Sequence, residues 1–147
     1  MQEITYRPIG IVHSDIKSRT GSPIQAVYGP EMKGTIELFP EYQDGLKDLE
    51  GFSHLILIFH FHLSSGFTLI QKPFLDDEPR GVFAIRSPRR PNPIGITIVK
   101  LEDMKGCDLE ISGLDIVDGT PLLDIKPFIP KFDTREAVEV GWIKDKV

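Results

Sequence analysis

The residues best suited to binding chemistry lie in one short segment, Arg86–Gly95. Three prolines in this segment fix three backbone φ angles and keep each preceding residue out of the α region. A stiff segment loses little conformational entropy when it binds a ligand. The arginine fork suits carboxylate and phosphate, and an asparagine amide can pair with the N6 and N7 edge of adenine. The segment predicts an anion or adenosine site, with a solvated surface loop as the alternative; its polar members are Arg86, Arg89, Arg90 and Asn92.

A second candidate segment is rich in carboxylates and begins with a predicted turn. The turn dipeptide Asp-Gly is followed by Thr-Pro, which leads into a strand. Asp115 and Asp118 are then expected at the rim of a pocket, as acceptors for ribose hydroxyls or an exocyclic amine. On the strand, a period of two places Leu122, Asp124 and Lys126 on one face. The alternative for the last two is an exposed ion pair, which would contribute under about 1 kcal/mol to stability.

Three histidines share a parity within residues 52–62, namely His54, His60 and His62. On one strand they would share a face, and imidazole is a ligand for zinc and iron. At about 3.3 Å per residue, however, His54 would stand about 20 Å from His60, too far to share an ion. The lone Cys107 offers no pair of thiolates. We therefore expect no metal, and we expect the histidines to line an interface or a wet pocket.

The elements that must position these residues are predicted to be strands. Twelve prolines and thirteen glycines divide the chain into short pieces, and period-two alternation with β-branched residues fills them. One brief helix is expected at Tyr42–Glu50, where Gly45 weakens it. Without crossover helices, a parallel sheet is disfavoured, and the fold class expected is all-β, mainly an antiparallel barrel with short helices. Strands are expected at residues 52–62, 81–86, 94–101, 107–112, 121–125 and 138–142.

Length and charge limit the class of protein further. A chain of 147 residues suits one domain, residues 1–147, with a real hydrophobic core. No apolar run approaches the about 20 residues of a membrane span, and the N-terminus lacks a signal-peptide pattern, so a cytoplasmic protein is expected. A net charge of −5 disfavours a nucleic-acid partner, yet residues 79–100 hold five basic residues and no acidic one. Such a stripe can engage a polyanion locally.

Three motifs in order resemble the TsaA/YaeB family, the TrmO-like methyltransferases. They are Gly-Phe-Ser-His-Leu at residues 51–55, the arginine- and proline-rich run at 80–95, and Asp-Gly-Thr-Pro with Asp-Ile-Lys-Pro at 118–127. The resemblance runs from about Pro8 to Asp133, which is nearly the whole chain. Because the motifs end there, we expect this chain to lack the second, C-terminal accessory domain of the family's bacterial members.

The resemblance implies a homodimeric β-barrel enzyme that uses S-adenosylmethionine to N6-methylate threonylcarbamoyladenosine at position 37 of tRNA. By position, the family's cofactor contacts fall on Gln25, Ala26, Val27, Ser64, Ser65, Arg86, Ile96, Asp115, Ile116, Val117 and Asp118. The residues expected to face the substrate nucleotide or its phosphates are Arg89, Arg90, Asn92 and Lys126.

For the reaction itself we expect Asp118, Asn92 and Lys126 to act at the reacting adenosine. A carboxylate such as Asp118 would accept a hydrogen bond from the N6–H as the new bond forms. Two departures from the family pattern, Ile24 and Phe128, affect substrate recognition more than cofactor binding. Three alternatives stay open: a methyltransferase acting on another RNA or a small molecule, a non-catalytic ligand-binding barrel, and, ranked lowest, a metal hydrolase built on the histidines.

Overall fold

The computed structural model describes residues 1–17 and 32–147. Contacts divide these residues into two compact units. The first unit, Met1–His62 with Ile94–Phe128, contains a closed antiparallel barrel. The second unit combines Leu63–Pro93 with Ile129–Val147. Each unit is described below by itself.

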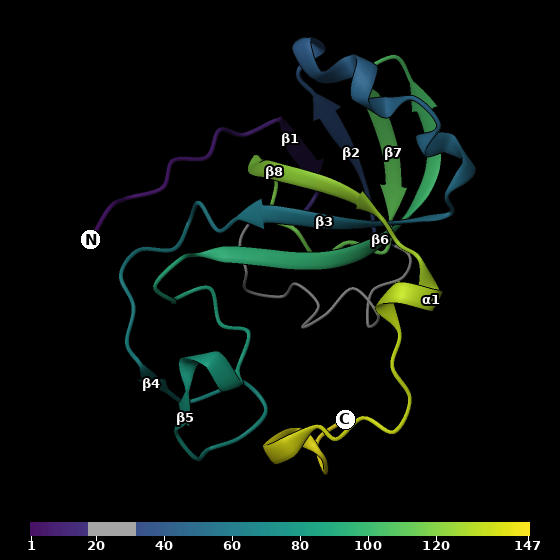
Figure 1. Cartoon of the computed structure of the whole chain (residues 1–147). Coiled ribbons are helices and arrows are strands. Elements are labelled where there is room, and N and C mark those ends of the chain that lie inside the picture. The colour runs from purple at the N-terminus through teal and green to yellow at the C-terminus, as the bar shows by residue number, and fades with distance from the viewer. Residues whose placement is uncertain (18–31) are drawn as a thin grey trace. The chain divides into compact units, whose positions relative to one another are not determined.

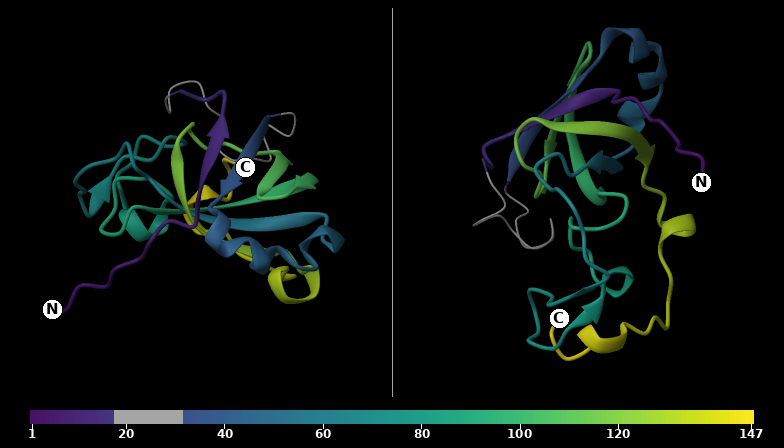
Figure 2. Two further views of the ribbon diagram at one scale, coloured as in Figure 1. Left: turned by 90° about the horizontal axis from the view of Figure 1, so that it is seen from above. Right: turned by 90° about the vertical axis from the view of Figure 1, so that its left-hand side faces the viewer.

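Six strands close the barrel, and every neighbouring pair is antiparallel (Figure 1). Closure joins the first strand to the last, since Gly10 is paired with Leu122 and Val12 with Thr120. The view from above in Figure 2 shows the strands curving around a common interior. The mainly antiparallel barrel expected from the sequence is confirmed. In spatial order the strands are β1 (Gly10–Ser14), β2 (Lys33–Leu38), β7 (Asp108–Ser112), β6 (Ile94–Lys105), β3 (His54–His60) and β8 (Thr120–Pro127).

The barrel interior is filled because alternate residues of each strand are apolar. In β3 the buried positions alternate with half-buried or exposed ones, and in β7 the buried Leu109 and Ile111 alternate with the exposed Asp108 and Glu110. The predicted strands at 52–62, 94–101, 107–112 and 121–125 correspond to β3, β6, β7 and β8. The core contains Val12, Ile36, Leu38, Leu46, Leu55, Leu57, Phe59, Val99, Leu109, Ile111, Leu114, Ile116 and Leu122.

Gly95, near the start of β6, allows two aromatic rings to pack against the strand backbone. It is paired with Phe59 of β3, and an ideal Cβ at this position would stand 2.5 Å from the Phe59 ring and 2.7 Å from the Phe61 ring. The two rings meet edge to face, with their centroids 5.3 Å apart. Any side chain at residue 95 would therefore have to displace these rings from the end of the core.

A β-bulge in β8 corrects one expectation from the sequence. Ile58 is paired with Asp124, but the next residue, Phe59, is paired with Leu122, so the register shifts by one residue. The shift turns Leu122 into the core, where it is fully buried, whereas Asp124 and Lys126 are not buried. The prediction that these three side chains share one face is wrong for Leu122, because period-two alternation does not survive an extra residue.

The expected helix at Tyr42–Glu50 is replaced by two 3₁₀ helices, Pro40–Leu46 and Leu49–Gly51. Between them Asp48 adopts a left-handed conformation with φ of 71°, which breaks the helical path. Leu46 is buried in the core, so the first of these helices covers one end of the barrel. 3₁₀ segments often serve as connectors, although the seven residues of the first one make it longer than most.

The second unit is built on a two-stranded hairpin of β4 (Ile70–Gln71) and β5 (Arg80–Gly81). The Trp142 indole N–H donates to the carbonyl of Ala84 at 2.7 Å, and the Arg80 guanidinium lies 5.1 Å from the centre of the Trp142 ring. These contacts join the two chain segments of the unit. Its other elements are the 3₁₀ helix Val82–Ala84, α1 (Pro130–Asp133) and the 3₁₀ helix Gly141–Ile143.

Two predicted strands of this unit are wrong. In 81–86 only Gly81 belongs to a strand, and the residues after it turn into the 3₁₀ helix, ahead of prolines that cannot donate to a strand ladder. In 138–142 the alternating valines are exposed, at 61% for Val138 and 47% for Val140, and a 3₁₀ helix begins at Gly141. Alternation alone does not make a strand where no neighbouring strand is available. In the described ranges, no helix is long and apolar enough to cross a membrane.

Candidate functional site

The acidic segment predicted at the rim of a pocket forms an arch between β7 and β8, which we call the 113–120 arch. Its apolar members alternate inward, with Leu114 and Ile116 fully buried. Its backbone is fastened to the end of β1: the Asp118 N–H donates to the Ile16 carbonyl at 2.7 Å, and the Gly119 N–H donates to Val12 at 2.8 Å. Gly119 has a φ of 84°, which suits glycine at this sharp turn. The arch is therefore a fixed part of the barrel.

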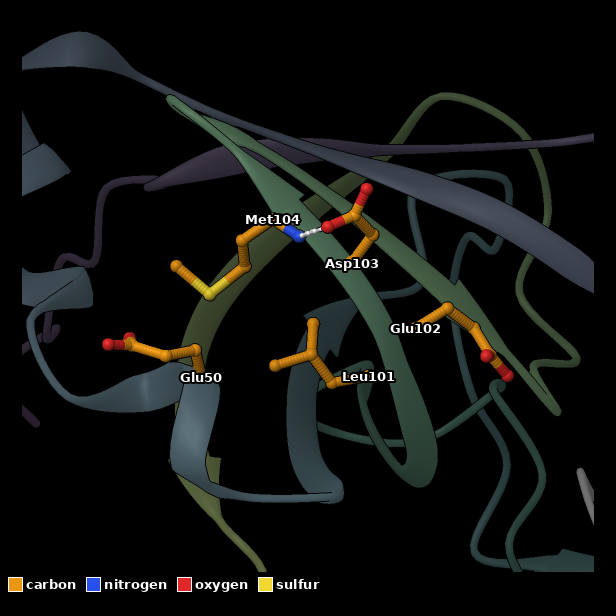
Figure 3. A pocket seen from close by; sticks show the side chains of 5 residues that line it. All are labelled: Glu50, Leu101, Glu102, Asp103 and Met104. Carbon is orange, nitrogen blue, oxygen red and sulfur yellow. Dashed lines mark hydrogen bonds between the residues drawn. The ribbon is translucent and has the colours of Figure 1, made fainter.

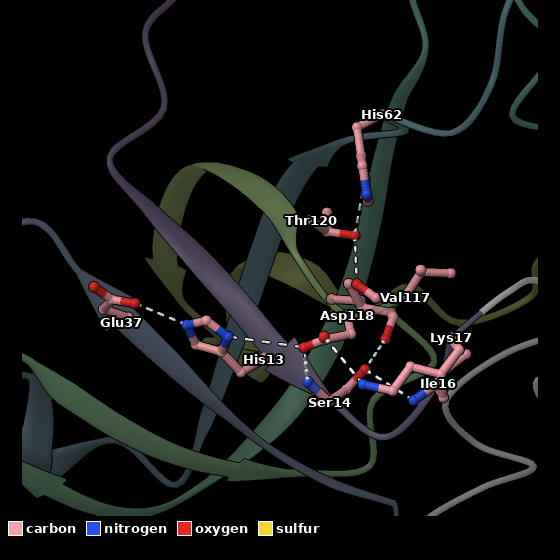
Figure 4. Close-up of polar contacts among 10 residues, drawn as sticks. His13, Ser14, Ile16, Lys17, Glu37, His62, Val117, Asp118 and Thr120 are labelled. Atoms are coloured by element: carbon pink, nitrogen blue, oxygen red, sulfur yellow. Dashed lines mark hydrogen bonds and ion pairs between the residues drawn. The ribbon is translucent and has the colours of Figure 1, made fainter.

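Side chains tie the arch to the same strand end (Figure 4). The Ser14 hydroxyl donates to the Ile116 carbonyl at 2.6 Å, while the Ser14 backbone N–H donates to Oδ1 of Asp118 at 3.0 Å. At the far side of the arch, the Thr120 hydroxyl donates to the Val117 carbonyl at 2.6 Å. Ser14 thus donates to both Ile116 and Asp118, and these hydrogen bonds hold the predicted cofactor residues 115–118 in one conformation.

Asp118 has an ionised carboxylate at neutral pH. The Ser14 N–H and then the Lys17 ammonium, whose Nζ lies 3.2 Å from Oδ2, hold the pKa of Asp118 below its usual range. A carboxylate with a lowered pKa is a weak proton acceptor but a good hydrogen-bond acceptor. Its chemistry therefore fits the holding of a polar hydrogen or a positive charge better than the removal of a proton.

In the second unit the structure brings two predicted segments together. The Ser64 hydroxyl donates to the Pro88 carbonyl at 3.2 Å, and the Gln71 amide donates to the Arg89 carbonyl. The serine pair at 64–65 therefore lies beside the proline-rich loop that carries Arg86. Three residues predicted for the cofactor, Ser64, Ser65 and Arg86, belong to this one loop cluster.

The arginines of the loop have different roles. Arg90 is half-buried and turned onto its own loop, where Nη1 donates to the carbonyls of Ile85 at 3.0 Å and Ser87 at 3.2 Å. Arg89 and Asn92 have exposed side chains. We infer that Arg90 holds the loop in shape, while Arg89 is placed to meet a partner from solvent.

The remaining barrel candidates, Ile96 and Lys126, are exposed residues of β6 and β8. Ile96 is 56% exposed and is paired with Ile58, which is paired in turn with Asp124 of β8. Lys126 is two residues after Asp124 on β8, with its Nζ 2.9 Å from the Asp124 carboxylate, and this carboxylate raises the pKa of Lys126. The ammonium is consequently charged across the neutral range.

The three residues expected to act in catalysis are not brought together within the barrel. Asp118 precedes the first residue of β8, whereas Lys126 is close to its last residue. Lys126 lies six residue steps after Thr120, which at about 3.3 Å per step is roughly 20 Å. Asn92 belongs to the second unit. The cofactor positions Gln25, Ala26 and Val27 lie outside the described residues. The catalytic assignment stays a prediction.

A shallow pocket elsewhere on the barrel holds none of the predicted residues (Figure 3). Its carboxylates would repel a phosphate, so it does not suit an RNA contact. Among the residues that the structure describes, no cluster of histidine, cysteine and carboxylate side chains has the geometry of a metal site. The pocket is lined by Glu50, Leu101, Glu102, Asp103 and Met104.

Four residues around the arch were not singled out by the sequence: His13, Ser14, Lys17 and Glu37. They contact Asp118 directly or through His13, from positions about a hundred residues earlier in the chain. His13 and Ser14 follow the buried Val12 in β1, so alternation marks His13 only as an outward residue. Only the closure of the barrel places these residues against the arch.

Comparison with known proteins agrees with this architecture. Residues 11–134 match the family model of the tRNA-methyltransferase O N-terminal domain. A probable S-adenosyl-L-methionine-binding protein of Pyrococcus abyssi is 54% identical, over 98% of this chain and 78% of its own. A tRNA (adenine(37)-N6)-methyltransferase of Mus musculus is 36% identical over 90% of this chain.

Solved structures give the same result. A crystal structure of TrmO matches with a TM-score of 0.84 and 35% identity over 95% of this chain, and TrmO from Pseudomonas aeruginosa matches with 0.83 over 97%. The chain spans 64% of each of these two structures and 32% of the mouse protein. The resemblance seen in the sequence motifs is thereby confirmed: the chain belongs to the tRNA-methyltransferase O N-terminal domain family.

Proposed function

We propose that this protein is an S-adenosylmethionine-dependent tRNA methyltransferase that modifies N6 of an adenosine. The observation that carries the proposal is the 36% identity to the mouse tRNA (adenine(37)-N6)-methyltransferase over 90% of this chain. The relative from Pyrococcus abyssi, with its name of S-adenosyl-L-methionine-binding protein, supports the cofactor. As the finer substrate we propose threonylcarbamoyladenosine at position 37, and as the location the cytoplasm, where such a substrate would be met.

The polar side chains predicted to contact the cofactor match its chemical groups. S-adenosylmethionine carries a cationic sulfonium that supplies the methyl group, together with ribose hydroxyls, an ammonium and a carboxylate. The ionised Asp118, with Asp115 on the same arch, offers acceptors for hydroxyl or ammonium groups. In the second unit, taken by itself, the Arg86 guanidinium is a group suited to a carboxylate. Because the arch is fixed to β1 by backbone hydrogen bonds, its acceptors are held in place before a ligand arrives.

The distribution of charge supports an RNA partner. Although the whole chain has a net charge of −5, the second unit carries nine basic and seven acidic residues. Two of those acids, Asp76 and Glu78, are paired with Arg80. The excess of positive charge therefore lies in the unit whose loop exposes Arg89. A cationic surface on an acidic protein is suited to contact one polyanion and to avoid others.

Two measurements test this proposal. Mass spectrometry of tRNA nucleosides from cells with and without the gene should show loss of the N6-methyl group from the modified adenosine. An unchanged nucleoside profile would overturn the tRNA assignment, and methylation of a different acceptor in vitro would favour the alternative of another RNA or a small molecule. Calorimetry with S-adenosylmethionine then separates both from a barrel that binds some other ligand.

A separate variant tests the proposed contact between Arg89 and RNA. Arg89→Ala is expected to weaken tRNA binding and to lower the slope of log affinity against log salt by about 0.7–0.9, the share of one phosphate contact. Arg135→Ala is the matched control, since Arg135 donates to the carbonyls of Phe132 and Thr134 within its own turn. Equal salt slopes for the Arg89 variant and the unmodified protein would contradict the contact.

We also propose a homodimer, formed through the outer face of β6. Ile94, Ile96 and Ile98 are 42%, 56% and 44% exposed along this strand. A row of exposed isoleucines is unusual for the solvent face of an antiparallel sheet, which is normally polar. A second copy applied by a two-fold axis would cover the same row on both partners. Light scattering should give twice the chain mass, and Ile96→Glu should give a monomer. A monomeric unmodified protein would refute this.

A further inference from the structure

A chain of polar side chains reaches from Asp118 across two barrel strands (Figure 4). His13, on β1, has its Nε2 2.8 Å from Oε1 of Glu37 on β2 and its Nδ1 3.7 Å from Oδ1 of Asp118. Residues 13 and 37 face the same side because both are outward positions of the β1–β2 pair, opposite the core residues Val12 and Ile36. The imidazole therefore stands between two carboxylates.

The ring is not placed there by packing. His13 and Glu37 have side chains 48% and 51% exposed, and Asp118 is 34% exposed. An exposed ring is free to rotate away from its neighbours, so its orientation rests on the polar contacts themselves. The 2.8 Å contact with Glu37 fixes the ring on one side, and this leaves Nδ1 directed at the arch.

The protonation state of the His13 ring decides whether its Nδ1 presents a lone pair or an N–H group to Asp118. A neutral imidazole has one N–H, and a donor at Nε2 that satisfies Glu37 leaves a lone pair at Nδ1, facing the Asp118 carboxylate. A protonated imidazole presents N–H groups to both carboxylates. The other charged group facing Asp118 is the Lys17 ammonium, 3.2 Å from Oδ2. The His13 ring and the Lys17 ammonium thus approach the two oxygens of the Asp118 carboxylate.

We propose that Glu37 and His13 are positioning residues for Asp118 and, through it, for the 113–120 arch that takes part in cofactor binding. Glu37 orients the ring, and the protonated ring steadies the carboxylate against the arch. The inference rests on the proposed function, since it assigns these residues to the same cofactor site. It predicts that cofactor affinity falls as the pH rises through the range in which His13 loses its proton.

The first test does not need the cofactor. Nitrogen-15 NMR of the ring reports the protonation and tautomer of His13 in the full chain. Glu37→Gln and Asp118→Asn are each expected to change the nitrogen shifts and the tautomer populations of the His13 ring, because each alters a carboxylate that faces a ring nitrogen. Glu110→Gln is the matched control, since Glu110 is an exposed carboxylate on the neighbouring strand β7, paired with Thr35. Nitrogen shifts and tautomer populations unmoved by both variants would overturn the coupling.

The second test is calorimetric titration with S-adenosylmethionine from about pH 6 to about pH 8, the range of histidine. We expect His13→Asn to weaken binding about two- to fivefold at the acid end, the size of an exposed charged contact, and to flatten the pH profile relative to the unmodified protein. His54→Asn is the control, because His54 is an exposed ring on β3 that contacts only the neighbouring Ser53 among the contacts seen for its side chain.

The outcomes of these two tests distinguish failure of the proposed function from failure of the positioning role. If the unmodified protein fails to bind S-adenosylmethionine, the proposed function fails, whereas the NMR titration still reports on the Glu37–His13–Asp118 contact. If the unmodified protein binds and His13→Asn has the same affinity and pH profile, the positioning role is refuted and the proposed function stands. A uniform loss of affinity at every pH would show a purely structural role, which also refutes the inference.

Discussion

Gly95→Ala tests directly how the Phe59 and Phe61 rings pack over Gly95 at the start of β6. The new methyl group would lie 2.5 Å from the Phe59 ring and 2.7 Å from the Phe61 ring, where carbon atoms normally stay about 3.5–4.0 Å apart. Both rings would have to move by about 1 Å in a core where Phe59 is only 6% exposed. Overpacking of this kind costs about 1–3 kcal/mol. The stiffer unfolded chain offsets about 0.4–1 kcal/mol, and the midpoints of the two ranges leave a net loss of about 1.3 kcal/mol.

Urea unfolding followed by circular dichroism measures this loss, and a matching decrease in melting temperature of roughly 3–8 °C is expected. Gly45→Ala is the control, because no atom lies within 4 Å of a Cβ at that position. In a Phe59→Leu background, Gly95→Ala should cost less, since part of the clash is removed. A Gly95→Ala protein as stable as the unmodified one would refute the claim that the two rings lie over this glycine.

Two further predictions concern the arch and the second unit. Because the pKa of Asp118 is lowered, the stability that this carboxylate contributes is complete above the pKa of an unfolded aspartate and is lost as the pH falls through its folded value. Unfolding of the unmodified protein and Asp118→Asn should therefore differ at neutral pH and converge in acid; a constant difference would contradict this. Trp142→Leu removes the hydrogen bond to Ala84 and the ring beside Arg80, so hydrogen exchange at residues 82–85 should quicken by a factor of about 5, for a loss of about 1 kcal/mol. Unaltered exchange there would count against the role of Trp142 in joining the unit.

Much of the barrel could be predicted from the sequence because its strands alternate on a surface with one buried face. Leu109 and Ile111 identify β7 in this way, and the β-branched run after Ile94 identifies β6. The same rule fails where alternation has no partner strand, as at Val138 and Val140. It also fails at the bulge in β8, since an inserted residue leaves no mark in the pattern and Leu122 turns inward.

The candidate site was predictable only in part, and the reason is geometric. The proline-rich loop and the carboxylates at 115–118 stand out by composition, so both could be named from local sequence alone. The partners of Asp118 could not, because Ser14 and Lys17 approach it from about a hundred residues away when β1 closes on β8. Likewise, nothing in the sequence shows that Arg90 turns back onto its own loop.

The pairing of β1 with β8 also has a kinetic consequence. Gly10 is paired with Leu122, so the ring of strands includes a pairing between residues more than a hundred positions apart in the sequence. The entropy of such a closure is lost before the hydrogen bonds compensate for it, and proteins dominated by distant pairings refold in milliseconds to seconds. The 113–120 arch is held by the same strand end. Ligand-binding competence should thus emerge only once this distant pairing has formed.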